Sequence, residues 1–156
     1  MFLEKGFAMR VFSVNQVNSS EESTIREVSQ VQAASNVADD YPATDVNYLA
    51  EIHRDENQGD IVLIATVDGV SAGVATDMEG GGALTIWVRP EYRGLGVAEA
   101  LLAAIETIYR LNGHTEAEAP SSLPGWLNTL LHQNGYGYRG RDELSKNLSR
   151  EPAFVV

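Results

Sequence analysis

The chain has 156 residues, enough for one compact domain to bury a core without disulfides or a structural metal. It contains no cysteine, which excludes disulfides, thiolate zinc sites and cysteine nucleophiles and fits a reducing compartment. Its 11 Lys and Arg stand against 22 Asp and Glu, and the resulting net charge of −11 argues against binding to nucleic acid or an anionic membrane.

The acidic charge favours a cationic partner, such as an amine-bearing small molecule or a basic protein segment, although solubility alone explains it equally well. No targeting segment is visible, because residues 1–9 are too short for a signal peptide or a membrane span. We therefore expect a cytoplasmic protein with a single domain over 1–156 and frayed ends at 1–9 and 149–156.

The first third of the chain carries signals for one strand and two helices. A strand is expected at 10–14, and Ser19 followed by Glu22 is a capping-box pattern that predicts the start of a helix. Pro42 closes this region because the residue before a proline is disfavoured in helical conformation, and a second short helix is expected at 45–53. The apolar face of the first helix consists of Ile25, Val28 and Val31.

The middle of the chain predicts antiparallel strands. The β-branched run at 61–67 is followed by Asp-Gly at 68–69, a strong signal for a two-residue hairpin turn, and the partner strand follows at 70–76. A glycine-rich turn at 79–82 leads to a third strand at 84–88.

The rest of the chain alternates helices and strands. We expect a helix at 97–111, a strand at 114–119, a helix that opens at 121–124, and one or two closing strands within 136–148. The order predicts an α/β fold with a mixed, mostly antiparallel sheet. The connection from 84–88 through the helix to 114–119 is expected to be a parallel, right-handed crossover.

The most informative stretch is 88–98, which reads VRPEYRGLGVA. A strand ends, Pro90 forces a turn, and Gly94 and Gly96 open a helix whose first amides have no internal partner and carry partial positive charge. These glycines let the backbone approach an anion closely, so the stretch predicts a pyrophosphate site. An ordinary tight turn is the alternative.

This stretch resembles motif A of the GNAT acetyltransferases, Val-x-Pro-x-x-Arg-Gly-x-Gly-(Ile/Val)-(Gly/Ala). The family core (Gln/Arg)-x-x-Gly-x-(Gly/Ala) is complete in Arg93, Gly96 and Ala98, and the resemblance covers roughly 61–138. It implies the GNAT fold, with helices on both faces of the sheet. It is not the dinucleotide fingerprint, because the glycines follow an antiparallel strand.

The resemblance also implies acetyl-CoA as co-substrate. In the family, the amides of this loop hold the pyrophosphate of coenzyme A, and the end of the preceding strand holds its pantetheine arm. By resemblance, these contacts fall on Trp87, Val88, Arg93, Gly94, Leu95, Gly96, Val97 and Ala98. Dimers are common in the family, so a homodimer is open.

A second family signature, at the end of the next helix, is incomplete here. The tyrosine that often protonates the departing thiolate falls on Leu131, and the asparagine often found seven residues earlier falls on Pro124. Either another group or water supplies that proton, or the protein does not catalyse. The other hydroxyls considered for this role are those of Ser121, Ser122, Tyr136 and Tyr138.

Glu116 and Glu118 are the candidate bases for the proton of the amine. They lie two apart on an expected internal strand, so both point to one face, and charges there are costly unless they are solvated or used. A face that simply meets water is the alternative. Asp39 and Asp40 are further candidates to line an amine site. No metal site is expected, since the three histidines show no ligand spacing.

The sequence therefore favours an N-acetyltransferase that moves the acetyl group of acetyl-CoA to an amine of a small molecule or a protein. A non-catalytic GNAT-fold binding or regulatory protein is the main alternative, because of Leu131 and Pro124. An acidic interaction module without a cofactor is a third reading, which the complete motif A disfavours.

Overall fold

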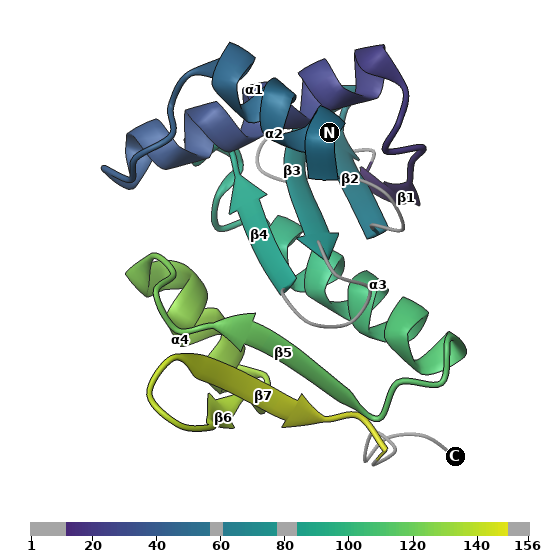
Figure 1. The fold of residues 1–156 in the computed structure, drawn as a ribbon, viewed down its shortest axis with the longest axis vertical. Coiled ribbons are helices and arrows are strands. Elements are labelled where there is room, and N and C mark those ends of the chain that lie inside the picture. The colour runs from purple at the N-terminus through teal and green to yellow at the C-terminus, as the bar shows by residue number, and fades with distance from the viewer. Residues whose placement is uncertain (1–11, 57–60, 78–83, 150–156) are drawn as a thin grey trace, which may run out of the picture.

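The computed structural model describes residues 12–56, 61–77 and 84–149, which form two β-sheets and four α-helices (Figure 1). The expected frayed ends lie outside these residues, apart from Ser149, and so does the glycine-rich turn at 79–82. None of the helices in the described part of the chain combines the length and the apolar character needed to cross a membrane.

The larger sheet is antiparallel throughout, in the order β1-β2-β3-β4. Its strands are β1 (Phe12–Gln16), β2 (Ile61–Val67), β3 (Val70–Asp77) and β4 (Leu84–Val88). The predicted hairpin is confirmed: Asp68 and Gly69 have φ angles of 52° and 82°, the left-handed values that such a turn needs. Because helices cover both faces of this sheet, β2 and β3 are buried over almost their whole length.

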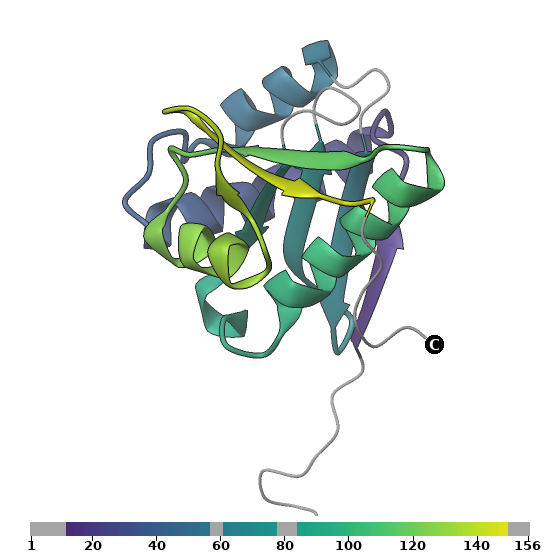
Figure 2. The ribbon, with the colours of Figure 1, turned by 90° about the horizontal axis from the view of Figure 1, so that it is seen from below.

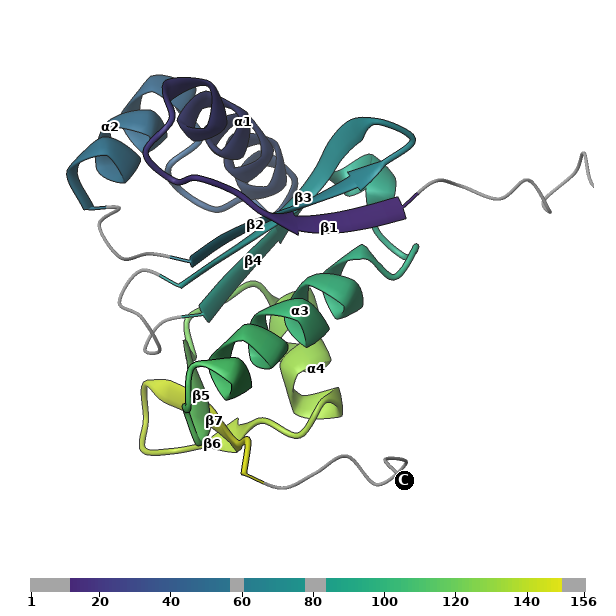
Figure 3. The same cartoon turned by 90° about the vertical axis from the view of Figure 1, so that its right-hand side faces the viewer.

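Helices lie on both faces of the larger sheet, as the sequence predicted. Helices α1 (Glu22–Ala38) and α2 (Val46–Glu56) cover one face, and α3 (Val97–Leu111) covers the other (Figures 1 and 3). The predicted apolar face of α1 is buried. The predicted N-cap, Ser19, is wrong, because the N-cap is Glu21. Asn18 accepts hydrogen bonds from the backbone amide and the hydroxyl of Ser20, so the helix begins only after this turn.

A second sheet has the order β5-β7-β6 and is also antiparallel. It contains β5 (Glu116–Pro120), β6 (Gly137–Tyr138) and β7 (Glu143–Asn147), with α4 (Gly125–Gln133) between β5 and β6 in the chain. Strands β4 and β5 contact each other, but in the described residues no backbone ladder joins them. The crossover through α3 is present, while the parallel pairing expected for it is not confirmed.

Gly73 in β3 sets how closely α3 approaches the sheet. A Cβ at this position would lie 2.8 Å from Val97 Cγ1, 3.0 Å from Leu101 Cδ1 and 3.2 Å from the carbonyl oxygen of Trp87. Val97 is the first residue of α3, so a glycine here lets the helix begin directly beside the end of β4.

We predict that Gly73→Ala lowers the free energy of unfolding by about 1–3 kcal/mol, because the added methyl overpacks the contact between α3 and β3. Urea denaturation measures this change. Gly125→Ala is the matched control, since a Cβ there meets no atom within 4 Å and alanine favours a helix. Equal stability of the two variants would contradict the close approach at Gly73.

Candidate active site

The connection from β4 to α3 is a glycine loop at a helix N-terminus. After β4 the chain makes a 3-10 turn at Pro90–Tyr92, and Gly94 and Gly96 then adopt φ angles of 82° and 89°. Both values are left-handed, which glycine adopts without strain. A Cβ at either glycine would meet no atom within 4 Å, so no neighbouring group covers that side of the loop.

Backbone amides are the available donors of this loop. Gly96 is the N-cap of α3, and its carbonyl accepts the first bond from the amide of Ala100. The amides of 97–99 therefore have no partner within the helix and carry the positive end of its dipole. The geometry is that of an anion-binding helix N-terminus.

A cavity of about 250 Å³ opens between this loop, the start of α3 and α4; we call it the loop cavity. Seen from below, α4 and the loop before α3 lie side by side (Figure 2). From α4 and its start, Trp126, Thr129 and Gln133 line the cavity. Five of the residues predicted to bind the cofactor also line it: Val88, Arg93, Gly94, Val97 and Ala98. Of the others, Leu95 is exposed, and Trp87 faces α1.

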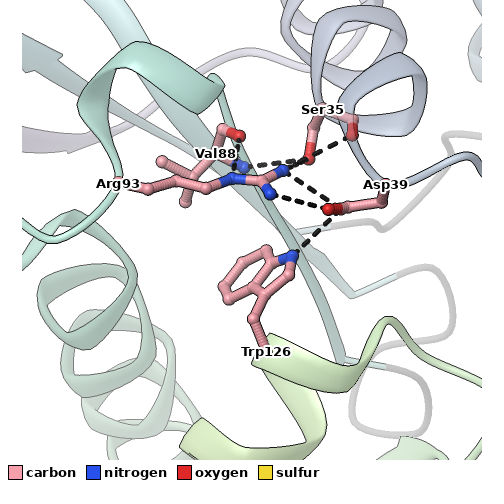
Figure 4. A network of polar contacts seen from close by, with 5 residues as sticks. All are labelled: Ser35, Asp39, Val88, Arg93 and Trp126. Carbon is pink, nitrogen blue, oxygen red and sulfur yellow. Dashed lines mark hydrogen bonds and ion pairs between the residues drawn. The ribbon is translucent and has the colours of Figure 1, made fainter.

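Arg93 and Trp126 both donate hydrogen bonds to the carboxylate of Asp39, and these bonds join three segments of the chain (Figure 4). Arg93 Nη1 and Nη2 donate to the two oxygens of Asp39, at 2.6 and 3.0 Å, and Trp126 Nε1 donates to Asp39 Oδ2 at 2.9 Å. The guanidinium also lies 4.9 Å from the centre of the Trp126 ring, a cation–π contact. The side chain of Asp39 is only 10 % exposed, so the pair is largely shielded from solvent.

The same cluster binds both backbone groups of Val88. The Val88 amide donates to Ser35 Oγ at 3.3 Å, and its carbonyl accepts from Arg93 Nε at 3.1 Å. Arg93 Nη2 donates to Ser35 Oγ at 3.0 Å. We call Ser35, Asp39, Val88, Arg93 and Trp126 the Asp39 cluster. Side chains therefore provide hydrogen-bond partners for both backbone groups of Val88, so no further strand needs to pair with β4 at this position.

A second cavity, of about 260 Å³, lies on the face of β4 that α1 covers; we call it the α1 cavity. Its walls come from the end of α1 and the loop after it, from β4, and from the segment before α4. The Asp39 cluster borders both cavities: Ser35 lines the α1 cavity, whereas Val88, Arg93 and Trp126 line the loop cavity. Strand β4 therefore contributes to both walls, through Val88 in the loop cavity and through 85–87 in the α1 cavity.

Glu116 and Glu118 share one face of β5, as their spacing predicted, while Ala117 and Ala119 between and beside them are buried. Arg139 Nη1 bonds to both carboxylates, at 3.0 Å from Glu118 Oε2. Partial burial, and then the nearby charge of Glu143, raises the pKa of Glu118, while Arg139 opposes the shift. Neither glutamate lines the loop cavity or the α1 cavity.

None of the hydroxyl candidates from the sequence lines either cavity. Tyr136 is buried and donates to Glu106 at 2.8 Å, Tyr138 is exposed, and Ser121 Oγ donates to the Arg141 carbonyl at 3.1 Å. Leu131 is fully buried in the core. The tyrosines that do line the cavities are Tyr92 in the loop cavity and Tyr41 in the α1 cavity.

Sequence reasoning missed the partners of Arg93. Asp39 lies 54 residues from Arg93 in the sequence, and Trp126 lies 87 residues from Asp39. Neither position carries a local sequence signal for these contacts. The sequence makes Asp39 a candidate to line an amine site, yet both of its oxygens bond to Arg93 or Trp126.

Comparison with solved structures identifies the fold. The chain is similar to PaiA N-acetyltransferase from Thermoplasma acidophilum in complex with coenzyme A, at 17 % identity and a TM-score of 0.66, covering 88 % of this chain and 99 % of that one. It is also similar to a GNAT family acetyltransferase from Brucella melitensis in complex with acetyl-CoA, at 16 % identity and a TM-score of 0.67, covering 88 % of each chain.

A third similar structure is the Salmonella typhimurium acetyltransferase that modifies the N-terminal serine of ribosomal protein L7/L12, at 14 % identity, a TM-score of 0.62, and coverage of 87 % and 94 %. These are acetyltransferase folds. The family model for the acetyltransferase (GNAT) domain matches residues 56–136, about half of the chain. The chain belongs to the GNAT acetyltransferase family. No curated protein matches it.

We predict that Asp39→Asn lowers the free energy of unfolding by about 1.5–3 kcal/mol, because it removes charge from hydrogen bonds that are largely shielded. Urea denaturation measures the loss. Glu22→Gln is the matched control: it removes the carboxylate from the exposed Glu22–Arg54 pair and should change stability much less. Equal losses would show that the Asp39 cluster contributes no more than a surface ion pair.

Proposed function

We propose that this protein is an N-acetyltransferase that moves the acetyl group of acetyl-CoA to a primary amine. The observation that carries the proposal is the pair of cavities that both border β4 and the Asp39 cluster, one of which opens onto the glycine loop. Membership of the GNAT family supports it, as do coenzyme A and acetyl-CoA in complexes of structurally similar proteins. The cytoplasmic location and a homodimer remain predictions.

The described residues fit coenzyme A. Phosphate oxygens need donors, and the uncovered loop at Gly94 and Gly96 offers backbone amides at the positive end of α3. Side-chain charge contributes little, because Asp39 pairs with Arg93, and Glu99 adds a negative charge to the wall of the loop cavity. Affinity for the pyrophosphate therefore depends on the backbone of 94–98, and the pantetheine arm would follow the cavity to Val88.

Acetyl transfer breaks the thioester C–S bond and forms an amide C–N bond. The nitrogen must lose a proton, and the thiolate must gain one. A lysine-like amine has a pKa of about 10.4, so its deprotonation near pH 7 costs about 4–5 kcal/mol. Holding the amine beside the thioester contributes roughly 7–11 kcal/mol in favourable geometry. A side chain that accepts the proton adds to this.

Glu118 is our candidate for that base, ahead of Glu116. Its side chain is 24 % exposed against 45 % for Glu116, and its raised pKa makes Glu118 a better proton acceptor than an ordinary glutamate. It lines neither cavity, so it would act through water. With Leu131 buried in the core, the proton for the thiolate would come from water or from a hydroxyl that lines a cavity.

The burial of Leu131 and the presence of Pro124 in the wall of the α1 cavity also favour a second candidate, a non-catalytic GNAT-fold binding protein. Thiol release from acetyl-CoA distinguishes the two. A binding protein would hold acetyl-CoA without transferring its acetyl group to any amine in a broad panel, whereas an acetyltransferase would release the thiol with at least one of them.

We predict that Gly96→Glu abolishes detectable binding of acetyl-CoA in calorimetry, because its carboxylate would occupy the uncovered side of the loop and repel the phosphates. Gly96→Ala is the control for the backbone, since it adds only a methyl and the strain of a left-handed φ. It should bind more weakly than the native protein but measurably. Native affinity in a folded Gly96→Glu variant would refute the proposed loop.

We predict that Glu118→Gln lowers turnover by about 10²–10⁴-fold near neutral pH and leaves the affinity for acetyl-CoA unchanged, because glutamine keeps the shape and lacks the basicity. The deficit should shrink as pH rises, because more amine is already neutral. Since its pKa is raised, native Glu118 should become protonated, and rate should fall, at a higher pH than for an ordinary glutamate.

Glu116→Gln is the matched control for this prediction and should cost less, because Glu116 is more exposed. Rates equal to the native rate across the pH range in both variants would mean that the two carboxylates are surface groups and that water alone collects the proton.

A further inference from the structure

The α1 cavity has an uncharged wall in the described part of the chain. Aromatic and aliphatic side chains form most of it: Tyr41, Pro42, Leu49, Trp87, Leu123 and Pro124. Two of its polar side chains, Ser35 and Asn36, already have partners. Ser35 Oγ accepts bonds from Val88 and Arg93, and Asn36 Nδ2 donates to the carbonyl of Ala43 at 2.9 Å. The wall therefore offers an apolar surface with no ionised side chain.

The carboxylate of Asp39, at the end of α1, cannot pair with a second ammonium group. Both oxygens of Asp39 bond to Arg93 or Trp126, and Asp39 is not part of the cavity wall. Because no described residue of the cavity wall is ionised, a polyamine or an aminoglycoside in this cavity would bury positive charges against an uncharged wall, which is costly. The net charge of −11 attracts cations to the protein as a whole, but among the described residues it places no carboxylate in the cavity wall.

The cavity also has a limited size and a fixed rim. Its volume of about 260 Å³ lies just below the roughly 300–1,000 Å³ of sites for drug-sized ligands, so it suits one ring or one branched group. On the rim, Ala43 has a φ of 66°, a strained value for alanine, and Asn36 holds it there. This loop is a preformed wall.

We propose that the acceptor is a primary amine that carries a single aromatic or branched apolar group, and that this group binds in the α1 cavity. Trp87 in the wall precedes Val88 of the loop cavity, so the nitrogen of such an amine would lie at the end of β4. The proposal rests on the proposed acetyltransferase function and specifies its substrate class.

Two measurements on the native protein test the substrate class. Calorimetry with coenzyme A present compares the binding of 2-phenylethylamine, 1,5-diaminopentane and spermidine, and thiol release from acetyl-CoA compares their kcat/KM. We expect 2-phenylethylamine to exceed both polyamines at least tenfold in each measurement. A tripeptide that begins with Phe carries the same aromatic group beside its amine. If its turnover equals that of 2-phenylethylamine, the proposal is supported and the acceptor amine is identified as a peptide N-terminus.

A preference for either polyamine would overturn the inference and leave the acetyltransferase function standing. Binding of 2-phenylethylamine without thiol release would support the cavity assignment and refute the transferase function. Absence of binding by 2-phenylethylamine would overturn the inference whether or not another amine is acetylated.

Leu123→Asp adds a carboxylate to the wall of the α1 cavity at a half-buried position. We expect kcat/KM for 2-phenylethylamine to fall at least tenfold and that for 1,5-diaminopentane to rise, with acetyl-CoA affinity unchanged. Leu111→Asp is the matched control, because it makes the same change at an 80 % exposed position outside both cavities. Equal acceptor preference in the two variants would overturn the inference. If Leu123→Asp does not fold, the measurements on the native protein decide.

Discussion

The arrangement of the site depends on one carboxylate. Asp39 ends α1, receives both ends of the Arg93 guanidinium from the loop after β4, and receives the indole N–H of Trp126 from α4. Three segments that are distant in the chain are fixed relative to one another by these bonds. Arg93 in turn bonds to the carbonyl of Val88, and Ser35 bonds to its amide. The backbone groups of Val88 that β3 does not pair are thereby bonded to side chains, and the second sheet forms around β7.

This arrangement leaves space on both sides of the end of β4. On one side, Gly73 lets α3 begin close to the sheet, and the loop with Gly94 and Gly96 presents backbone amides at the helix N-terminus. On the other side, the segment that follows α1 closes an apolar cavity against β4. A transfer reaction needs two ligands that meet at one point, and the Asp39 cluster lies where the walls of the two cavities meet. The charge of Arg93 is compensated there by Asp39, so the proposed anion site depends on backbone amides.

Local signals were sufficient for much of the fold. Asp68 and Gly69 specify their turn through the left-handed backbone that they tolerate, and Gly96, whose φ is 89°, marks the start of α3 in the same way. The alternation along β5 predicted a shared face for its two glutamates, but not Arg139 beside them.

The partners of Arg93 were not predictable, because contacts between Asp39, Arg93 and Trp126 exist only once the chain has folded. The division into two sheets has the same non-local origin. The cap at Ser19 was mispredicted because Asn18 offers a competing acceptor.

The most direct test of this account is a crystal structure of the protein with acetyl-CoA bound. The account predicts pyrophosphate oxygens within hydrogen-bonding distance of the backbone amides of 94–98, the pantetheine arm in the cavity beside Trp126, and the acetyl group at Val88, facing the α1 cavity. A pyrophosphate bound elsewhere, or an acetyl group with no access to the α1 cavity, would contradict the claim that the end of β4 is where the two substrates meet.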